Sequence, residues 1–95
     1  MTVRLTGLAV SDLSEIRDHY RAIDDDIERR FLDQFDLVVE RLLSFPRGAP
    51  SVEGFSGVRR ARIRALPYGV FYRLEGDDIL ILRVLHTRRA APDLE

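Results

Sequence analysis

Three strand-like runs close the chain, and they constrain its fold more than any other feature. The runs cover residues 58–66, 70–75 and 79–86, and they are separated by Pro67 and by the segment Gly76-Asp77-Asp78. A turn of this composition between runs of β-branched and aromatic residues is typical of a hairpin. The last run is nearly all apolar, so we expect it to lie centrally in a sheet with both of its faces covered.

Two amphipathic helices are predicted before these strands. Apolar residues recur at helical spacing at positions 13, 16, 20 and 23, and again at positions 27, 31, 35, 38 and 42. The first helix should begin at Gly7 or Ser11. Asp24-Asp25-Asp26 separates the two stripes and should cap the second helix, because aspartate is favoured at such positions. Phe45-Pro46 should end the second helix.

These elements together predict an α+β fold. A short alternation over residues 2–6 predicts a first strand, so the expected order is β-α-α-β-β-β. Two helices joined by a few residues should form an antiparallel hairpin. We therefore expect residues 1–95 to form a single small domain, in which an N-terminal helical hairpin packs on a mainly antiparallel sheet.

Composition excludes several classes of function. The chain contains no cysteine, so disulfides and thiolate–metal sites are excluded and a cytoplasmic location is expected. The two histidines, His19 and His86, lie in different predicted elements, and we expect neither a metal nor another cofactor. No apolar run approaches the roughly 20 residues that span a bilayer, so no membrane partner is expected. A glycine-rich phosphate loop and a nucleophile elbow are also missing.

Charge is divided unevenly along the chain. Residues 1–57 contain seven arginines and eleven carboxylates, whereas residues 58–95 contain eight arginines and five carboxylates. All fifteen cations are arginine, which suits bidentate contacts to carboxylate or phosphate, although codon usage in a GC-rich genome also explains the lack of lysine. Arg60, Arg62 and Arg64 alternate with apolar residues and should form a row on one strand face. Such a row repels itself and predicts an anionic partner.

The last predicted strand carries two candidate functional residues, Arg83 and His86. Strand alternation puts Arg83 on the face of apolar residues 79, 81 and 85, where an unpaired cation is costly, so we expect a buried ion pair or a pocket residue. It puts His86 on the face of residues 80, 82 and 84. A histidine near arginines can act as a general base in RNA cleavage. Alternatively, His86 caps the strand and Arg88-Arg89 form a solvated tail.

The order of motifs resembles the RelE/ParE toxins of bacterial type II toxin–antitoxin systems. In those proteins an arginine-bearing strand leads to a Pro-Tyr turn, an aromatic strand, an acidic turn, and an apolar strand that ends in histidine and two arginines. The corresponding segments are Arg59-Arg60, Pro67-Tyr68, Phe71-Tyr72-Arg73, Asp77-Asp78, and Arg83-Val84-Leu85-His86 with Arg88-Arg89. Residues of the two predicted helices are also similar, so the resemblance covers nearly the whole chain.

The resemblance implies a toxin, and two activities are known among such toxins. RelE-like members cut messenger RNA on the ribosome, whereas ParE-like members poison DNA gyrase. This chain has no lysine, has Gly69 where nucleolytic members carry a cation, and has no tyrosine after His86. It is therefore closest to the ParE-like plasmid-stabilisation toxins, and we expect a gyrase inhibitor without catalytic activity. The alternative is a RelE-like ribosome-dependent endoribonuclease with Arg83 and His86 as catalytic residues, and a third reading is a relative that is toxic to nothing.

The resemblance also implies a cognate antitoxin. We expect an acidic, partly helical segment that folds on binding and pairs with the arginine face, giving a hetero-oligomer. Its carboxylates would cover the side chains that the target needs. The candidate residues for binding the target or the antitoxin are Arg59, Arg60, Arg62, Arg64, Tyr68, Tyr72, Arg73, His86, Arg88 and Arg89.

Overall fold

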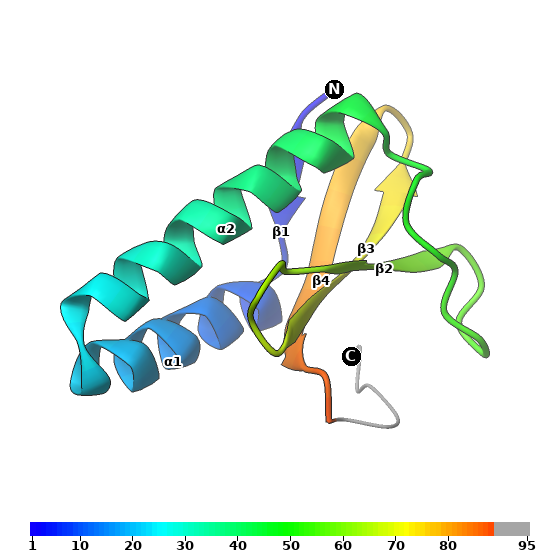
Figure 1. The fold of residues 1–95 in the computed structure, drawn as a ribbon. Coiled ribbons are helices and arrows are strands. Elements are labelled where there is room, and N and C mark those ends of the chain that lie inside the picture. The colour runs from blue at the N-terminus through cyan, green and yellow to red at the C-terminus, as the bar shows by residue number, and fades with distance from the viewer. Residues whose placement is uncertain (89–95) are drawn as a thin grey trace.

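The order of the elements is the predicted one (Figure 1). The computed structural model describes residues 1–88. The elements are β1 (Val3–Leu5), α1 (Gly7–Ile23), α2 (Asp25–Ser44), β2 (Val58–Arg62), β3 (Tyr68–Glu75) and β4 (Asp78–His86). The two helices form an antiparallel hairpin beside a four-stranded sheet. The predicted α+β class is therefore confirmed.

The sheet has the order β1-β4-β3-β2, so β4 lies inside it as predicted. The β1 strand pairs with β4 in parallel, whereas β2 with β3 and β3 with β4 are antiparallel. A tight turn at Gly76-Asp77 joins β3 to β4, and Gly76 has a φ of 60°, in the left-handed region that favours glycine. The predicted hairpin is confirmed, except that Asp78 belongs to the strand and not to the turn.

Aspartate and threonine side chains set the helix boundaries. The side chain of Thr6 accepts a hydrogen bond from the Ala9 backbone N–H, which starts α1 at Gly7. Asp24 ends α1 by donating its backbone N–H to the Tyr20 carbonyl, and its side chain caps α2 by accepting from the Asp26 N–H at 2.8 Å. One residue thus serves both ends of the hairpin turn, because its extended backbone can follow neither helix.

The core lies between the helical hairpin and the sheet. The second helical stripe is buried at Phe31, Phe35, Val38 and Leu42, as predicted. The first stripe is buried only at Ile16 and partly at Leu13 and Tyr20, and Ile23 is 61% exposed. The prediction for Ile23 is wrong because this residue is the last of α1, at the end of the hairpin that projects from the sheet (Figure 1). The core-facing residues of the sheet are Ala61, Val70, Tyr72, Ile79, Ile81 and Val84, and Ile63, directly after β2, joins them.

The first of the predicted C-terminal strands is shorter than expected. It ends at Arg62, because the chain turns over residues 63–67, where Ala65 has a φ of 65°. The Ile63 N–H donates to the Tyr68 carbonyl at 3.0 Å and closes this turn. The predicted alternation therefore holds through buried Ile63 and exposed Arg64, and it fails at Ala65, which is exposed.

A β-bulge at Leu82 breaks the predicted alternation of β4, so that the prediction holds for residues 79–82 and fails for Val84 and Leu85 relative to them. Phe71 pairs with Arg83, but the next residue, Tyr72, pairs with Ile81, which leaves Leu82 without a partner residue in β3. Strict alternation placed Ile81 and Val84 on opposite faces, whereas both lie in the core beneath the helices. The residues that face the other way form a second cluster, which the loop before β2 helps to cover, and they are Val58, Phe71, Leu82 and Leu85 with Val52, Phe55 and Leu80.

Candidate functional site

Arg83 forms a buried ion pair with Asp12 of α1. Its Nε lies 2.8 Å from Asp12 Oδ2 and its Nη2 lies 2.9 Å from Asp12 Oδ1, which is a bidentate arrangement. Both residues are buried, with 9% of Arg83 and 8% of Asp12 exposed. Of the two roles expected for Arg83, the structure shows the ion pair. The guanidinium group thus holds α1 against β4.

Asp12 also accepts a backbone hydrogen bond from β4, which explains why a carboxylate lies in the core. The β1 strand ends at Leu5, so the edge of β4 beyond that point lacks a strand partner. Thr6 satisfies the first part of this edge, because its N–H donates to Ile81 O and its hydroxyl donates to Leu82 O at 2.7 Å. Asp12 Oδ2 then accepts from the Val84 N–H at 3.0 Å. Thr6, which caps α1, and Asp12 within α1 therefore supply the hydrogen-bond partners that the missing strand would have provided.

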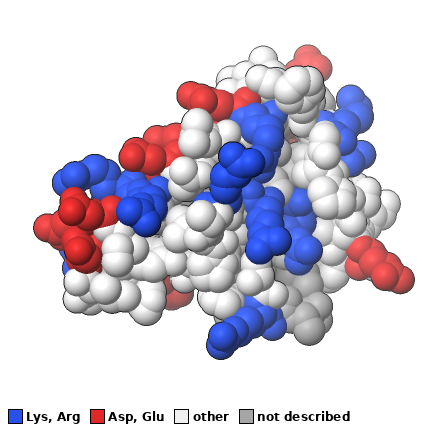
Figure 2. Space-filling model, in the orientation of Figure 1, with Lys and Arg blue, Asp and Glu red and all other residues white. Residues whose placement is uncertain are grey.

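The arginines divide into two groups. Within residues 1–88, a carboxylate oxygen lies within 4.0 Å of a nitrogen of Arg4, Arg17, Arg21, Arg29, Arg73 and Arg83. No carboxylate among those residues is as close to Arg30, Arg41, Arg47, Arg59, Arg60, Arg62, Arg64 or Arg88. Cationic side chains gather over the centre of one face, and carboxylates lie along the helical hairpin (Figure 2). The uneven charge along the sequence is therefore also uneven in space.

An open groove of about 650 Å³ lies among the arginines that have no carboxylate partner within residues 1–88. The end of α2, the following loop and the edge strand β2 form it. Its lining residues are Arg41, Leu42, Phe45, Gly48, Ala49, Pro50, Arg60, Ala61, Arg62, Gly69 and Thr87. The lining thus combines an aliphatic surface with three guanidinium groups, and none of the described residues that line it is acidic. We call this feature the arginine groove.

Two of the predicted binding residues line the arginine groove, namely Arg60 and Arg62. Arg64 is exposed, but it lies in the turn after β2 and does not line the groove. Arg88 is exposed and follows Thr87, which lines the groove. Arg89 lies outside the described residues.

Other predicted binding residues make contacts within the fold. The Arg59 guanidinium donates to the carbonyls of Arg47 and Ala49, at 3.0 and 2.7 Å, and so anchors the loop that forms one wall of the groove. Tyr72 is fully buried, and its hydroxyl donates to the Pro46 carbonyl at 2.8 Å. Burial raises the pKa of Tyr72 above its ordinary value, so this hydroxyl stays a neutral donor.

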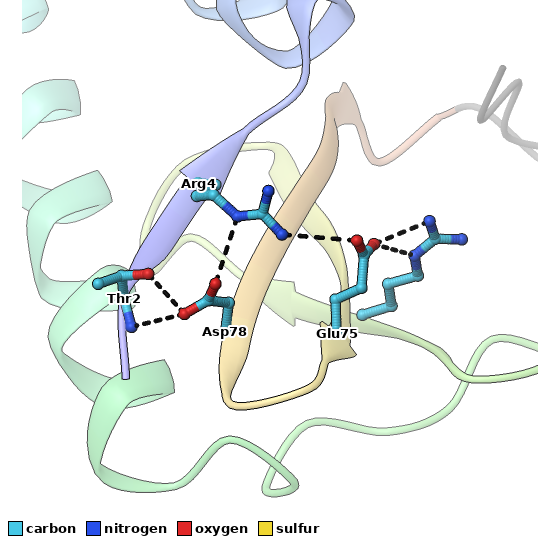
Figure 3. A network of polar contacts seen from close by, with 5 residues as sticks. Thr2, Arg4, Glu75 and Asp78 are labelled. Atoms are coloured by element: carbon cyan, nitrogen blue, oxygen red, sulfur yellow. Dashed lines mark hydrogen bonds and ion pairs between the residues drawn. The ribbon is translucent and has the colours of Figure 1, made fainter.

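Arg73 belongs to a polar network near the β3–β4 turn, at the other end of these strands from the arginine groove (Figure 3). Its guanidinium lies 2.9 Å from Glu75, and Glu75 also contacts Arg4 of β1 at 3.5 Å. Asp78 accepts hydrogen bonds from the hydroxyl and the backbone N–H of Thr2, at 2.6 and 3.2 Å. These hydrogen bonds hold the pKa of Asp78 below its usual value. The network ties the first strand to the β3–β4 turn.

Tyr68 and His86 lie in a second, smaller hollow. The Tyr68 ring packs edge-on against the His86 ring, with centroids 5.4 Å apart. The hollow encloses about 190 Å³ between α1 and β4, and Asp12, Glu15, Ile16, His19, Tyr68, Val84, Leu85 and His86 line it. The sequence reasoning did not connect Glu15 and His19 with His86. Their spacing from Asp12, three and seven residues along one helix, was the signal that places them on one face.

The hydrogen bonding of His86 bears on its chemistry. Its Nδ1 accepts a hydrogen bond from the Arg88 backbone N–H at 3.1 Å. In the neutral ring the proton therefore resides on Nε2, so that nitrogen is a donor. A donor suits the binding of an acceptor, whereas abstraction of a proton requires a free lone pair.

The sequence profile described as the ParE toxin of the type II toxin–antitoxin system parDE matches residues 3–91. The chain belongs to the ParE toxin family. A solved structure of the "Chromosomal ParDE TA system from P. aeruginosa" is similar, with a TM-score of 0.78 and 26% sequence identity. The match covers 90% of this chain and 95% of that chain. No curated protein matched the chain.

Membership of the ParE family confirms the resemblance to the RelE/ParE toxins. It makes the chain the toxin of a type II toxin–antitoxin system, and such a system implies an antitoxin partner. Within residues 1–88 there is no group of three or more histidine or acidic side chains that could hold a metal ion. No helix in that part of the chain is long and apolar enough to cross a membrane.

Proposed function

We propose that this ParE toxin acts in the cytoplasm, where it inhibits DNA gyrase by protein–protein binding and is neutralised by a cognate antitoxin in a hetero-oligomer. The observation that carries the proposal is the arginine groove, which joins an aliphatic lining to guanidinium groups without carboxylate partners in residues 1–88. Arginine and aromatic residues are enriched in protein interfaces and among the residues that carry most of the binding energy, and the groove offers Arg41, Arg60, Arg62 and exposed Phe45.

The same groove suits neutralisation by an acidic segment. Carboxylates of an antitoxin would pair with Arg41, Arg60 and Arg62, and apolar side chains would contact Phe45, Ala49 and Pro50. Complementary charge of this kind speeds association and discriminates between partners. An antitoxin bound there would cover the side chains that the target needs, so neutralisation by occlusion requires no change in the shape of the toxin.

The alternative function is ribosome-dependent cleavage of messenger RNA. The hollow that brings His19, Tyr68 and His86 together favours this reading, because histidine and tyrosine are common acid–base groups. Two observations weigh against it. The Arg83 guanidinium pairs with Asp12 in the core, and the Nδ1 of His86 is occupied by a backbone donor. We therefore favour the non-catalytic toxin.

A gyrase assay with purified toxin tests the proposal. The toxin should inhibit DNA supercoiling and trap gyrase on cleaved DNA, and it should leave ribosome-bound messenger RNA intact. The double variant Arg60→Gln/Arg62→Gln should lose most of the inhibition. Arg30→Gln is the matched control, since Arg30 is exposed, likewise lacks a carboxylate partner among residues 1–88, and does not line the groove.

Neutralisation is tested with the protein encoded beside the toxin. Its addition should restore supercoiling, and it should bind the double variant more weakly than the wild type. Messenger cleavage in the ribosomal A site, lost in His86→Ala and accompanied by unaffected gyrase, would establish the endoribonuclease in place of the gyrase inhibitor. Normal growth of cells that express the toxin alone would contradict both activities.

A further inference from the structure

Gly69 of β3 stands where the backbone must approach another side chain. A Cβ at this position would lie 3.0 Å from the Cδ and 3.1 Å from the Cγ of Arg60. The φ of Gly69 is not in the left-handed region, so the backbone conformation does not require glycine. Glycine inside a strand lowers its stability and often marks such a close approach. The missing side chain therefore provides the space in which the aliphatic stem of Arg60 lies.

The position of that stem determines where the Arg60 guanidinium can reach. The Arg60 backbone is held by a hydrogen bond from its N–H to the Pro50 carbonyl at 3.0 Å. Arg60 and Gly69 both line the arginine groove, and Arg62 is the strand partner of Gly69. The stem thus crosses β3 at a residue without a side chain. A side chain at Gly69 would push it away from this path.

We propose that Gly69 positions Arg60 as the specificity-determining contact of the arginine groove, and that this contact takes a peptide segment with a carboxylate beside an aliphatic side chain. The inference rests on the proposed function, because it specifies the partner chemistry of the same groove. The carboxylate pairs with Arg60 and Arg62, which have no carboxylate partner among residues 1–88. The aliphatic side chain contacts Phe45, Ala49 and Pro50, the apolar residues of the groove lining that are exposed or half-buried.

The lining favours a peptide over a nucleic acid. Single-stranded nucleic acids need aromatic platforms on which their bases stack. Phe45 is the one aromatic residue among the described residues that line the groove, and the rest of its apolar lining is aliphatic. A volume of about 650 Å³ lies within the range of about 300–1,000 Å³ that encloses a small ligand, which fits a few side chains and not a duplex.

The probe is a synthetic octapeptide with one leucine between two glutamates and serine or glycine elsewhere. Its dissociation constant is measured by NMR chemical-shift titration of the toxin. The wild-type toxin should bind it in preference to the matched peptides in which leucine is serine or the glutamates are glutamine. Arg60→Gln should weaken binding about ten- to a hundredfold, as expected for a hydrogen bond to a charged group. Arg30→Gln should leave it unchanged.

Gly69→Ala tests the positioning role directly. It should weaken peptide binding by less than Arg60→Gln, because the Arg60 stem need shift by only a few tenths of an ångström, and the larger Gly69→Val should weaken binding more than Gly69→Ala. The double variant Gly69→Ala/Arg60→Gln should be no weaker than Arg60→Gln alone, because both changes act on one contact. The thermal midpoint of Gly69→Ala should stay close to that of the wild type, since the nearest atoms belong to an exposed, flexible side chain.

Several results would overturn the inference. Full peptide affinity in Gly69→Ala and Gly69→Val, or additive losses in the double variant, would show that Gly69 does not position Arg60. Tighter binding of a single-stranded DNA oligonucleotide than of the peptide, with the same dependence on Arg60, would reassign the groove to nucleic acid. If the wild-type toxin inhibits gyrase but does not bind the peptide, this inference fails and the proposed function stands. If the toxin binds the peptide but does not inhibit gyrase, the proposed target fails and this inference stands.

Discussion

Removal of the Asp12 carboxylate should strongly lower the free energy of unfolding, because Asp12 belongs to the one buried ion pair among residues 1–88. In Asp12→Ala the buried Arg83 guanidinium loses the Asp12 carboxylate, and the Val84 N–H loses its acceptor. Loss of one partner of a buried pair costs about 3–5 kcal/mol. The whole free energy of unfolding of a domain is about 5–15 kcal/mol, so this variant loses a large share of it.

Urea denaturation followed by far-UV circular dichroism measures this loss. With a denaturant dependence of about 1–3 kcal/mol/M, the urea midpoint should fall by at least about 1 M. Asp18→Ala is the matched control on the same helix, because Asp18 is exposed and its contact with Arg21 is 3.9 Å long. An exposed pair of this kind contributes about 0–1 kcal/mol.

An apolar double variant separates the cost of a buried Arg83 charge that has lost the Asp12 carboxylate from the cost of lost packing. Asp12→Leu/Arg83→Met should be more stable than either Asp12→Ala or Arg83→Ala, because no charge remains in the core. The unpaired Val84 N–H should still leave it about 1–3 kcal/mol below the wild type. If Asp12→Ala loses no more than Asp18→Ala, the ion pair does not hold α1 to β4 and the reasoning fails.

Three further predictions concern the rest of the fold. The lowered pKa of Asp78 means that its hydrogen bonds from Thr2 stabilise the fold above the usual carboxyl pKa of 3.8 and that this contribution is lost as the pH falls below it. Urea midpoints between pH 6 and 3 should therefore fall less steeply in Asp78→Asn than in the wild type, and parallel curves would contradict the assignment. Tyr72→Phe should lower the free energy of unfolding by about 1 kcal/mol, because the hydrogen bond to Pro46 is lost, and the folded variant should still inhibit gyrase. Loss of inhibition would indicate that Tyr72 contacts the target. Gly76→Ala should cost about 1–2 kcal/mol because of the left-handed backbone, and an unchanged thermal midpoint would exclude strain at this turn.

Local signals were sufficient for the elements and for the helical core. Helical spacing located the buried stripe of α2, and the acidic segment at Asp24 located the hairpin turn, because both depend on neighbours close in sequence. The turn at Gly76-Asp77 could likewise be predicted from neighbouring residues. The faces of β4 could not be predicted in this way, because the bulge at Leu82 arises from pairing with β3 and leaves no clear mark in the composition of either strand.

The candidate site shows the same division. Alternation in the sequence identified Arg60, Arg62 and Arg64 as exposed, and all three are exposed. It could not show that the end of α2 lies beside β2, so Arg41, Leu42 and Phe45 were missed as parts of the groove. It also could not separate Arg59 and Tyr72, which hold the loop and the core, from the residues left for a partner.

The sequence by itself determined the order of the elements, the membership of the ParE toxin family and the sign of the charge on the C-terminal strands. These follow from spacing and residue type, which act over a few residues. Only the tertiary structure decided which cations are available. Asp12 pairs with Arg83 across 71 positions of the chain, and Glu75 pairs with Arg73, while the arginines around the groove have no carboxylate partner in residues 1–88. Whether a charge is satisfied depends on distances of a few ångströms between elements, and such distances are set by packing.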